Sequence, residues 1–190
     1  MLEKIPSAVG RALKSVHAGA EELAVAHTEI TGVNASIELA SSAFEYNGRI
    51  PKEYTADGVG LSPPLEWHGV PPSAQAVVLL IEDPDSPTPA PLVHAIVWDL
   101  PGVDASLPEG ALPTQGDDPH NAMGRNSYLS ATYLPPDPPP GHGDHRYVFQ
   151  IFALDYVPHF DSAPGRAKLL EALRDRVLAK GLLIGVYGRT

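Results

Sequence analysis

The chain opens with apolar residues that recur every three or four positions, which is the period of an amphipathic helix. They are Val9, Leu13, Val16, Ala20 and Leu23. This pattern predicts a helix over residues 6–27, although Gly10 and Gly19 lower its intrinsic stability. The apolar face of such a helix needs a partner. The pattern leaves two partners open, the body of the protein itself or a second copy of the chain.

From residue 37 onward the pattern changes to short apolar runs separated by turn-forming residues, which is typical of strands. Almost continuous apolar runs at residues 76–81, 93–100 and 147–154 predict strands buried on both faces. Shorter strands are predicted at residues 37–39 and 182–187. These runs place most of the regular structure in a sheet.

Three further segments complete the expected order of elements. Asn47-Gly48 predicts a hairpin, because this pair suits a type I′ turn. A helix is expected over residues 166–180, ended by Gly181 and with one apolar face made by Leu169, Leu173 and Val177. Residues 101–132 show no strong period, and a segment of this kind in a compact domain is usually functional or flexible.

The order of elements predicts an α+β chain dominated by sheet, with one domain at residues 37–190 and a helical extension at residues 1–36. The composition supports this interpretation. The chain has 21 prolines and 17 glycines among 190 residues, well above the usual share of about 12% for the pair. Such a chain favours turns and short strands over a mostly helical fold.

Charge and composition exclude several classes of function. The 13 basic and 23 acidic residues give a net charge of -10, which disfavours nucleic acid and anionic membrane surfaces as partners. There are no cysteines, so disulfides, thiolate zinc sites and a cysteine nucleophile are excluded. No apolar run reaches the length of a membrane span and no signal-peptide pattern is present, so a cytoplasmic protein is expected.

Two acids and a histidine are the first candidates for chemistry. Asp83 and Asp85 follow the buried run at residues 76–81, and side chains two positions apart in an extended chain point the same way. A turn with solvated acids would explain them equally. His94 lies within an apolar run, so its hydrogen-bond partner must come from elsewhere in the fold. The acid loop is the natural supplier, which predicts a His–Asp cluster at an edge of the sheet.

A glycine-rich stretch at residues 141–147 leads into the third buried run and places His145 and Tyr147 on one face. A polar loop entering a strand is the simpler alternative. The stretch lacks the Lys-Ser/Thr ending of a phosphate-binding loop, and the chain has no nucleophile elbow. The acids and histidines have no recognisable metal-ligand spacing, so no metal or cofactor is expected.

Taken in order, these motifs resemble the phosphatidylethanolamine-binding protein family, in its bacterial Raf-kinase-inhibitor-like branch. The resemblance covers residues 37–188. It is carried by Asp83–Pro87, by His94 within its strand and by Pro138–Tyr147, with support from Ile50–Gly58, Leu61–Trp67 and Leu183–Tyr187. Three separated motifs in the right order are more specific than any one of them alone.

The resemblance implies a β-sandwich of two sheets with peripheral helices and a small anion pocket at one end. The pocket residues that it implies are Asp83, Asp85, Pro87, His94, Tyr133, Pro138, His145 and Tyr147. It also implies a cis peptide bond before Pro87. The chain departs from its relatives at Leu134-Pro135, where a Gly-Gly pair is usual, and proline removes a backbone donor there.

The function implied by the resemblance is binding of phosphate, phosphoethanolamine or a phospholipid head group, with regulation of a protein partner such as a kinase. Two acids would repel a bound phosphate. A zwitterionic ligand whose ammonium faces Asp83 or Asp85 would remove this repulsion, as would a proton shared within the His–Asp cluster.

Two other classes of function stay open at this point. One is a hydrolase, an esterase or phosphatase, with His94 or His145 as general base. An enzyme is less expected, because no nucleophile or metal set has a recognisable spacing. The other is an inhibitor of a kinase or protease that contacts its partner through residues 101–132 and not through the pocket. A homodimer formed through the N-terminal extension also remains open.

Overall fold

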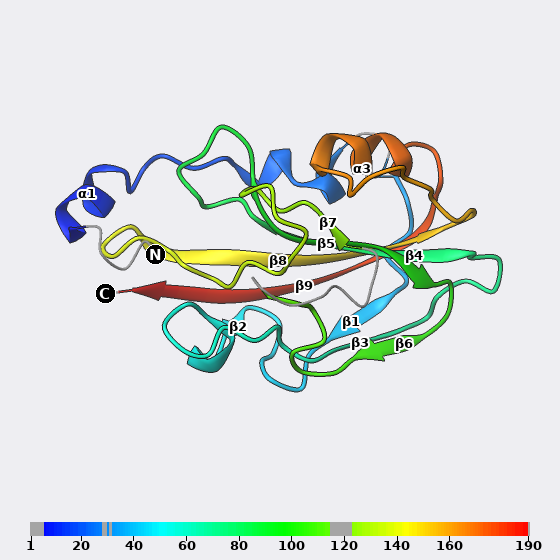
Figure 1. Ribbon diagram of the computed structural model, residues 1–190, viewed down its shortest axis with the longest axis horizontal. Coiled ribbons are helices and arrows are strands. Elements are labelled where there is room, and N and C mark those ends of the chain that lie inside the picture. Colours follow the sequence, from blue (N-terminus) through cyan, green and yellow to red (C-terminus); the bar gives the residue numbers. More distant parts are fainter. Residues whose placement is uncertain (1–5, 28–29, 31, 115–122, 190) are drawn as a thin grey trace.

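The computed structural model describes residues 6–27, 30, 32–114 and 123–189. Its core is a six-stranded sheet of order β2-β9-β8-β4-β5-β7, faced by a three-stranded sheet of order β1-β3-β6. Figure 1 shows the small sheet along one face of the large sheet, and α3 with the N-terminal extension along the other. The fold is thus the mostly β sandwich with peripheral helices that the resemblance implies.

The elements are short except in the large sheet. The strands are β1 (Glu38–Ala40), β2 (Gly48–Arg49), β3 (Leu65–His68), β4 (Ala76–Asp83), β5 (Leu92–Pro101), β6 (Ala105–Leu107), β7 (Met123–Gly124), β8 (Gly143–Leu154) and β9 (Val177–Arg189). The α-helices are α1 (Ser7–Ala12) and α3 (Arg166–Leu173). Three 3-10 turns are η2 (Ala20–Glu22), η3 (Ala24–Ala26) and η4 (Lys52–Tyr54).

The three strongest apolar runs form β4, β5 and β8 in the middle of the large sheet, as predicted. Every residue of β4 is buried, and β4 pairs antiparallel with β5 on one side and β8 on the other. An antiparallel strand is usually solvated on one face. Here both faces are covered by packed layers, which explains why the runs are almost continuously apolar.

Two apolar clusters lie on the two faces of the large sheet. The cluster between the sheets includes Trp67 and Phe149. The cluster on the outer face joins Phe152 of β8 to Leu169 of α3 and to Ala24 of the N-terminal extension. The extension therefore contributes side chains to the core, while the division of the chain between residues 36 and 37 stays a prediction.

The helix expected over residues 6–27 is α-helical only in α1, so most of that prediction is wrong. Gly19 has a φ of 96°, which lies outside the helical region. The N–H groups of Ala18 and Gly19 donate to the carbonyls of Ser86 and Pro84 at 3.1 and 3.0 Å. Hydrogen bonds to the rest of the protein thus replace the helical ones, and the chain continues in 3-10 turns.

Two other predictions need correction. The second helix ends at Leu173, and residues 177–180 begin β9 instead, because they pair with the end of β8. Asn47 does adopt a positive φ of 59°. The strand after it, β2, pairs parallel with β9 rather than forming a hairpin. Residues 101–132 contain β6 and β7, and their stretch 115–122 lies outside the described residues.

Candidate functional site

A cavity of about 250 Å³ lies at the end of the large sheet where β4 stops and β8 begins. Its polar groups are Asp83, His94, His145 and Tyr147, together with Ser86, Thr88, Tyr128 and Asp137. Its remaining walls are largely apolar, and two of these side chains, Val9 and Leu13, come from the N-terminal extension. The cavity therefore combines a polar floor with an apolar mouth.

The sheet brings the floor residues together from three neighbouring strands. Asp83 is the last residue of β4, while His145 and Tyr147 lie two positions apart on β8, which pairs with β4. Side chains two positions apart on a strand share a face. His145 and Tyr147 therefore lie on one face of β8, as predicted, and both line the cavity.

His94 enters the cavity because β5 carries a bulge at this residue. Ile81 of β4 pairs with Ala95, and the next residue, Glu82, pairs with Val93. His94 is thus the extra residue between two regular pairs. Bulges of this kind redirect side chains and are frequent beside functional sites. The bulge explains how a histidine inside an apolar run reaches a polar pocket.

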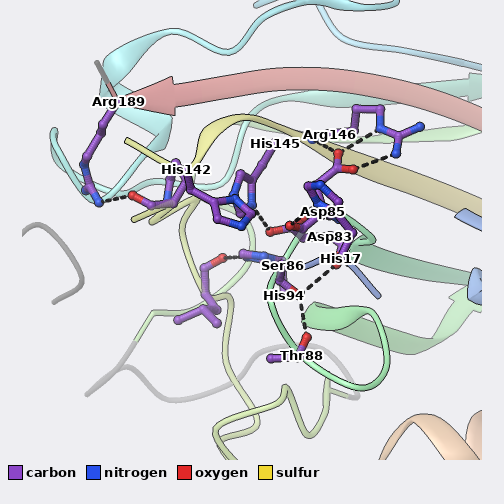
Figure 2. Close-up of polar contacts among 12 residues, drawn as sticks. His17, Asp83, Asp85, Ser86, Thr88, His94, His142, His145, Arg146 and Arg189 are labelled. Carbon is purple, nitrogen blue, oxygen red and sulfur yellow. Dashed lines mark hydrogen bonds and ion pairs between the residues drawn. The ribbon is translucent and has the colours of Figure 1, made fainter. Parts of the chain in front are cut away.

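A chain of hydrogen bonds runs from Asp83 through His145 to His142 (Figure 2) and continues to the N-terminal extension. The Asp83 carboxylate is 2.7 Å from Nδ1 of His145, and Nε2 of His145 is 2.7 Å from Nδ1 of His142. Nε2 of His142 is 2.8 Å from the carbonyl oxygen of Leu13. A carbonyl only accepts hydrogen bonds, so His142 donates from Nε2 and its Nδ1 accepts when the ring is neutral.

The hydrogens in this chain of hydrogen bonds can be counted. Three hydrogen bonds need three hydrogens, whereas two neutral imidazoles and one carboxylate supply only two. For all three contacts to be hydrogen bonds at once, the cluster of Asp83, His145 and His142 needs one additional proton. Burial, and secondly the neighbouring His145, lower the pKa of His142. His142 is therefore neutral, and its Nδ1 accepts from Nε2 of His145.

His94 and Tyr147 offer the unpaired polar atoms of the floor. Nδ1 of His94 donates to the carbonyl of Leu134 at 2.6 Å. Burial holds the pKa of His94 below its ordinary value, so the ring is neutral and Nε2 has a free lone pair. Among the described residues, neither this Nε2 nor the Tyr147 hydroxyl has a hydrogen-bond partner. A buried group left unpaired costs about 1–3 kcal/mol, so these two atoms are suited to bind a ligand.

Asp85 does not line the cavity, which corrects its predicted role beside Asp83. Its carboxylate accepts from Nε and Nη2 of Arg146 at 2.8 and 2.6 Å and from the Arg146 backbone N–H at 2.8 Å. Figure 2 shows the two acids pointing to different partners. Burial alone would raise the pKa of Asp85, but these hydrogen bonds from Arg146 lower it. Asp85 is therefore an ionised structural acid.

The rim of the cavity is held by a residue that the sequence analysis did not identify. Arg189 donates to Asp137 at 2.7 Å, to the carbonyl of Pro138 at 2.6 Å and to both oxygens of Asp57 at 2.8 Å. Pro138 lines the cavity as predicted. Arg189 carries no local motif, because its partners come from two distant parts of the chain, Asp57 and the pair Asp137-Pro138.

Three further expectations concern the same region. Pro87 lines the cavity, but all described peptide bonds are trans, so the predicted cis bond before Pro87 is wrong. Tyr133 is buried behind the wall and does not line the cavity. The N–H of Leu134 is used by the carbonyl of His94 at 2.8 Å. With Pro135 next in the chain, the rim offers no free backbone donor at this pair of residues.

The charges around the cavity limit the ligands that it can hold. Among the described residues, no lysine or arginine lines it. The part of the chain that the structure describes also contains no group of three or more histidines and acids placed to hold a metal ion. Across the same residues, no helix is long and apolar enough to cross a bilayer.

The two-sheet sandwich with one enclosed, polar-floored pocket at its end defines the class of protein. A model of the phosphatidylethanolamine-binding protein family matches residues 40–188. The chain therefore belongs to the phosphatidylethanolamine-binding protein family. The match begins after the N-terminal extension.

Individual relatives agree with this assignment. A UPF0098 protein of Methanothermobacter thermautotrophicus is 37% identical over 154 residues, which cover 80% of this chain and 99% of the relative. A UPF0098 protein of Pyrococcus horikoshii is 38% identical over 152 residues, covering 78% of this chain and 75% of the relative.

Solved structures show the same fold. A phosphatidylethanolamine-binding protein homologue from Chlamydia trachomatis matches with a TM-score of 0.73 and 37% identity, over 83% of this chain and 99% of that one. YbcL of E. coli matches with a TM-score of 0.74 over 82% of this chain and 100% of that one. Its identity of 24% supports the fold alone.

Proposed function

We propose that this protein binds a small phosphorylated ligand, such as a phosphate monoester or a phospholipid head group, in the cavity at the end of the large sheet. The observation that carries the proposal is the pair of buried, unpaired atoms on the floor, Nε2 of His94 and the hydroxyl of Tyr147. Both lie in an enclosed pocket, and the two rings are 5.1 Å apart and almost perpendicular. One phosphate group is small enough to reach both.

The protonation states support a phosphate that carries a hydrogen. Burial raises the pKa of Tyr147 well above its ordinary value, so its O–H donates to a phosphate oxygen. The neutral His94 accepts at Nε2. It pairs with a P–O–H group, or takes up a proton as the anion binds. A fully ionised phosphate is disfavoured, because no lysine or arginine lines the cavity among the described residues.

A proton shared between Asp83 and His145, whose Nδ1 lies 2.7 Å from the carboxylate, would reduce the repulsion expected from Asp83. This arrangement supports the second of the two solutions that the sequence leaves open. A zwitterionic ligand remains compatible, with Asp83 as the acid that its ammonium group faces. Asp85 is excluded from that role because Arg146 occupies both of its oxygens.

The test is isothermal titration calorimetry of inorganic phosphate and phosphoethanolamine into the wild type and three variants. Tyr147→Phe removes only the floor hydroxyl and is expected to weaken both ligands about tenfold, the usual loss for a hydrogen bond to a charged group. Tyr133→Phe is the matched control, since this buried tyrosine does not line the cavity. Equal affinities for the wild type and Tyr147→Phe would refute the proposal.

Asp83→Asn distinguishes the two ways in which repulsion between Asp83 and a bound phosphate could be relieved. A loss of affinity for phosphoethanolamine alone supports an ammonium group beside Asp83. A similar change for both ligands supports the shared proton. If neither affinity changes, Asp83 has no part in binding.

A further inference from the structure

Residues 7–17, which we call the capping segment, form one side of the cavity mouth. They lie outside the stretch that matches the family model, residues 40–188. Three of them, Val9, Gly10 and Leu13, line the cavity. Figure 1 shows α1 at the end of the molecule, beside the loop that leads into β8. The floor of the pocket thus lies within the stretch that matches the family model, and this wall lies outside it.

The capping segment touches the pocket through its backbone. The carbonyl of Leu13 accepts the hydrogen bond from Nε2 of His142 at 2.8 Å. A Cβ atom added to Gly10 would lie 2.1 Å from the carbonyl oxygen of Pro140, so the absence of a side chain permits the contact. Nδ1 of His17 lies 3.1 Å from the carbonyl oxygen of Asp85 and can donate to it. The segment therefore contacts both the proline-rich rim and the acid loop.

The side chains that this segment adds are apolar. Val9 and Leu13 stand at the mouth with Leu92 and Leu134, above the polar floor of His94. Apolar surface at the mouth does not strengthen the binding of inorganic phosphate, because this ligand would lie at the floor. It favours a ligand whose phosphate bears an apolar group, because each buried methylene strengthens binding about fourfold.

The size of the cavity limits that group. Its volume of about 250 Å³ is just under the range of about 300–1,000 Å³ that is usual for ligand pockets. A phosphate with a short alkyl or aryl substituent suits this volume, and two long acyl chains do not.

We propose that the capping segment determines specificity through Val9 and Leu13, which select phosphate monoesters bearing a short apolar substituent over inorganic phosphate. This inference rests on the proposed phosphate-binding function and names the class of ligand for it. Val16 provides an internal comparison. Val9, Leu13 and Val16 are 46%, 37% and 44% exposed, but Val16 does not line the cavity.

The test uses calorimetry of the full chain with two probes, phenyl phosphate and inorganic phosphate. Wild-type protein is expected to bind phenyl phosphate at least tenfold more tightly. Val9→Ser/Leu13→Ser is expected to lose about tenfold in affinity for phenyl phosphate and less than twofold for inorganic phosphate. Val16→Ser, a change of the same kind in the same segment, is expected to leave both affinities unchanged.

Three outcomes overturn the inference, and they are distinguishable. If inorganic phosphate and phenyl phosphate bind wild type equally, the mouth does not select apolar groups, while the proposed function stands. If phenyl phosphate binds more tightly but Val9→Ser/Leu13→Ser keeps the preference, the selection lies elsewhere in the cavity. If neither probe binds wild type, the proposed function fails and the inference fails with it. Unfolding curves of the variants establish that all are folded, and Leu13→Ser alone replaces the double variant if it is not.

Discussion

The two halves of the N-terminal extension share one apolar period but are attached in different ways. We call residues 20–27 the anchor segment. It contacts a buried acid, Glu82, which accepts from the N–H of Ala24 at 3.0 Å. Glu82 also accepts from Arg166 of α3 at 2.5 Å. The N–H of Val25 donates to Gln150 at 2.8 Å. In the capping segment only Gly10 is buried, and its contacts are made mainly by backbone atoms.

This difference separates stability from ligand selection within a single stretch of chain. The anchor segment belongs to the outer apolar cluster and donates one of the hydrogen bonds to the buried Glu82, so its loss would remove apolar contacts and leave that carboxylate with one partner fewer. The capping segment buries little, and its removal would mainly change the pocket. We therefore expect mutations in the two halves to affect different measurements.

The largest effect on the free energy of unfolding is expected where the anchor segment contacts the large sheet. Glu82→Ala removes a fully buried carboxylate that accepts from Ala24, Gln150 and Arg166. Breaking a buried ion pair from one side costs about 3–5 kcal/mol. The free energy of unfolding, measured by chemical denaturation, should fall by this amount.

The matched control for Glu82→Ala is Glu21→Ala, which removes an exposed acid from the anchor segment itself. Exposed positions usually change stability by less than about 0.5 kcal/mol. A loss below about 1 kcal/mol for Glu82→Ala would remove the distinction between the two segments.

A smaller effect on stability is expected in the capping segment. Gly10→Ala places a Cβ atom against the carbonyl of Pro140, so the segment has to move away from the rim. The affinity for phenyl phosphate should fall severalfold, while the free energy of unfolding changes by less than about 1 kcal/mol because little is buried. Gly32→Ala is the control, since nothing lies within 4 Å of a Cβ atom there. A loss of 3 kcal/mol for Gly10→Ala would show that the capping segment also stabilises the fold.

The smallest effect concerns pH and again separates the two segments. Burial, and secondly His145, lower the pKa of His142 below its ordinary value of 6.5. Leu13 and His17 of the capping segment lie against the ring, and this burial outweighs the hydrogen bond to the Leu13 carbonyl, which by itself raises the pKa. Protonation therefore favours the released segment. As the pH falls from 6.5 through the lowered pKa, release should increase, and above 6.5 the docked form should be fully favoured.

The measurement is the rate of trypsin cleavage after Arg11 and Lys14, two exposed residues of the capping segment. The rate is corrected for trypsin's own pH dependence with an unstructured peptide of the same sequence. His142→Gln can place its amide N–H near the position of Nε2 and still donate to Leu13, but it does not titrate, so its corrected rate should not depend on pH. A wild-type rate equally insensitive to pH would contradict this expectation.

The strands of the large sheet could be predicted because β4, β5 and β8 are covered on both faces, which makes their sequences continuously apolar. The two helices were predicted too long for the opposite reason. Amphipathic period is a local signal. At Gly19 hydrogen bonds to the loop after β4 outweigh it, and at Val177 hydrogen bonds to β8 do so. Local patterns fail where the backbone finds non-local partners.

The site was predictable in part. Asp83, His94, His145 and Tyr147 lie in motifs that the resemblance identifies, and all four line the cavity. Asp85 belongs to the same motif, but a salt bridge to Arg146 turns it away, and no local pattern indicates that partner. The capping segment was missed because its apolar residues were read as one face of a long helix.

The sequence by itself determined the family, the buried strands and the residue types of the pocket floor, because these depend on local motifs and on the number of buried neighbours. Only the tertiary structure decided where the groups meet. The bulge that directs His94 into the cavity arises from the register between β4 and β5. The chain of hydrogen bonds from Asp83 through His145 and His142 ends at a carbonyl 129 residues away from His142, that of Leu13. Register and long-range hydrogen bonding are properties of the folded chain, and no local stretch of sequence contains them.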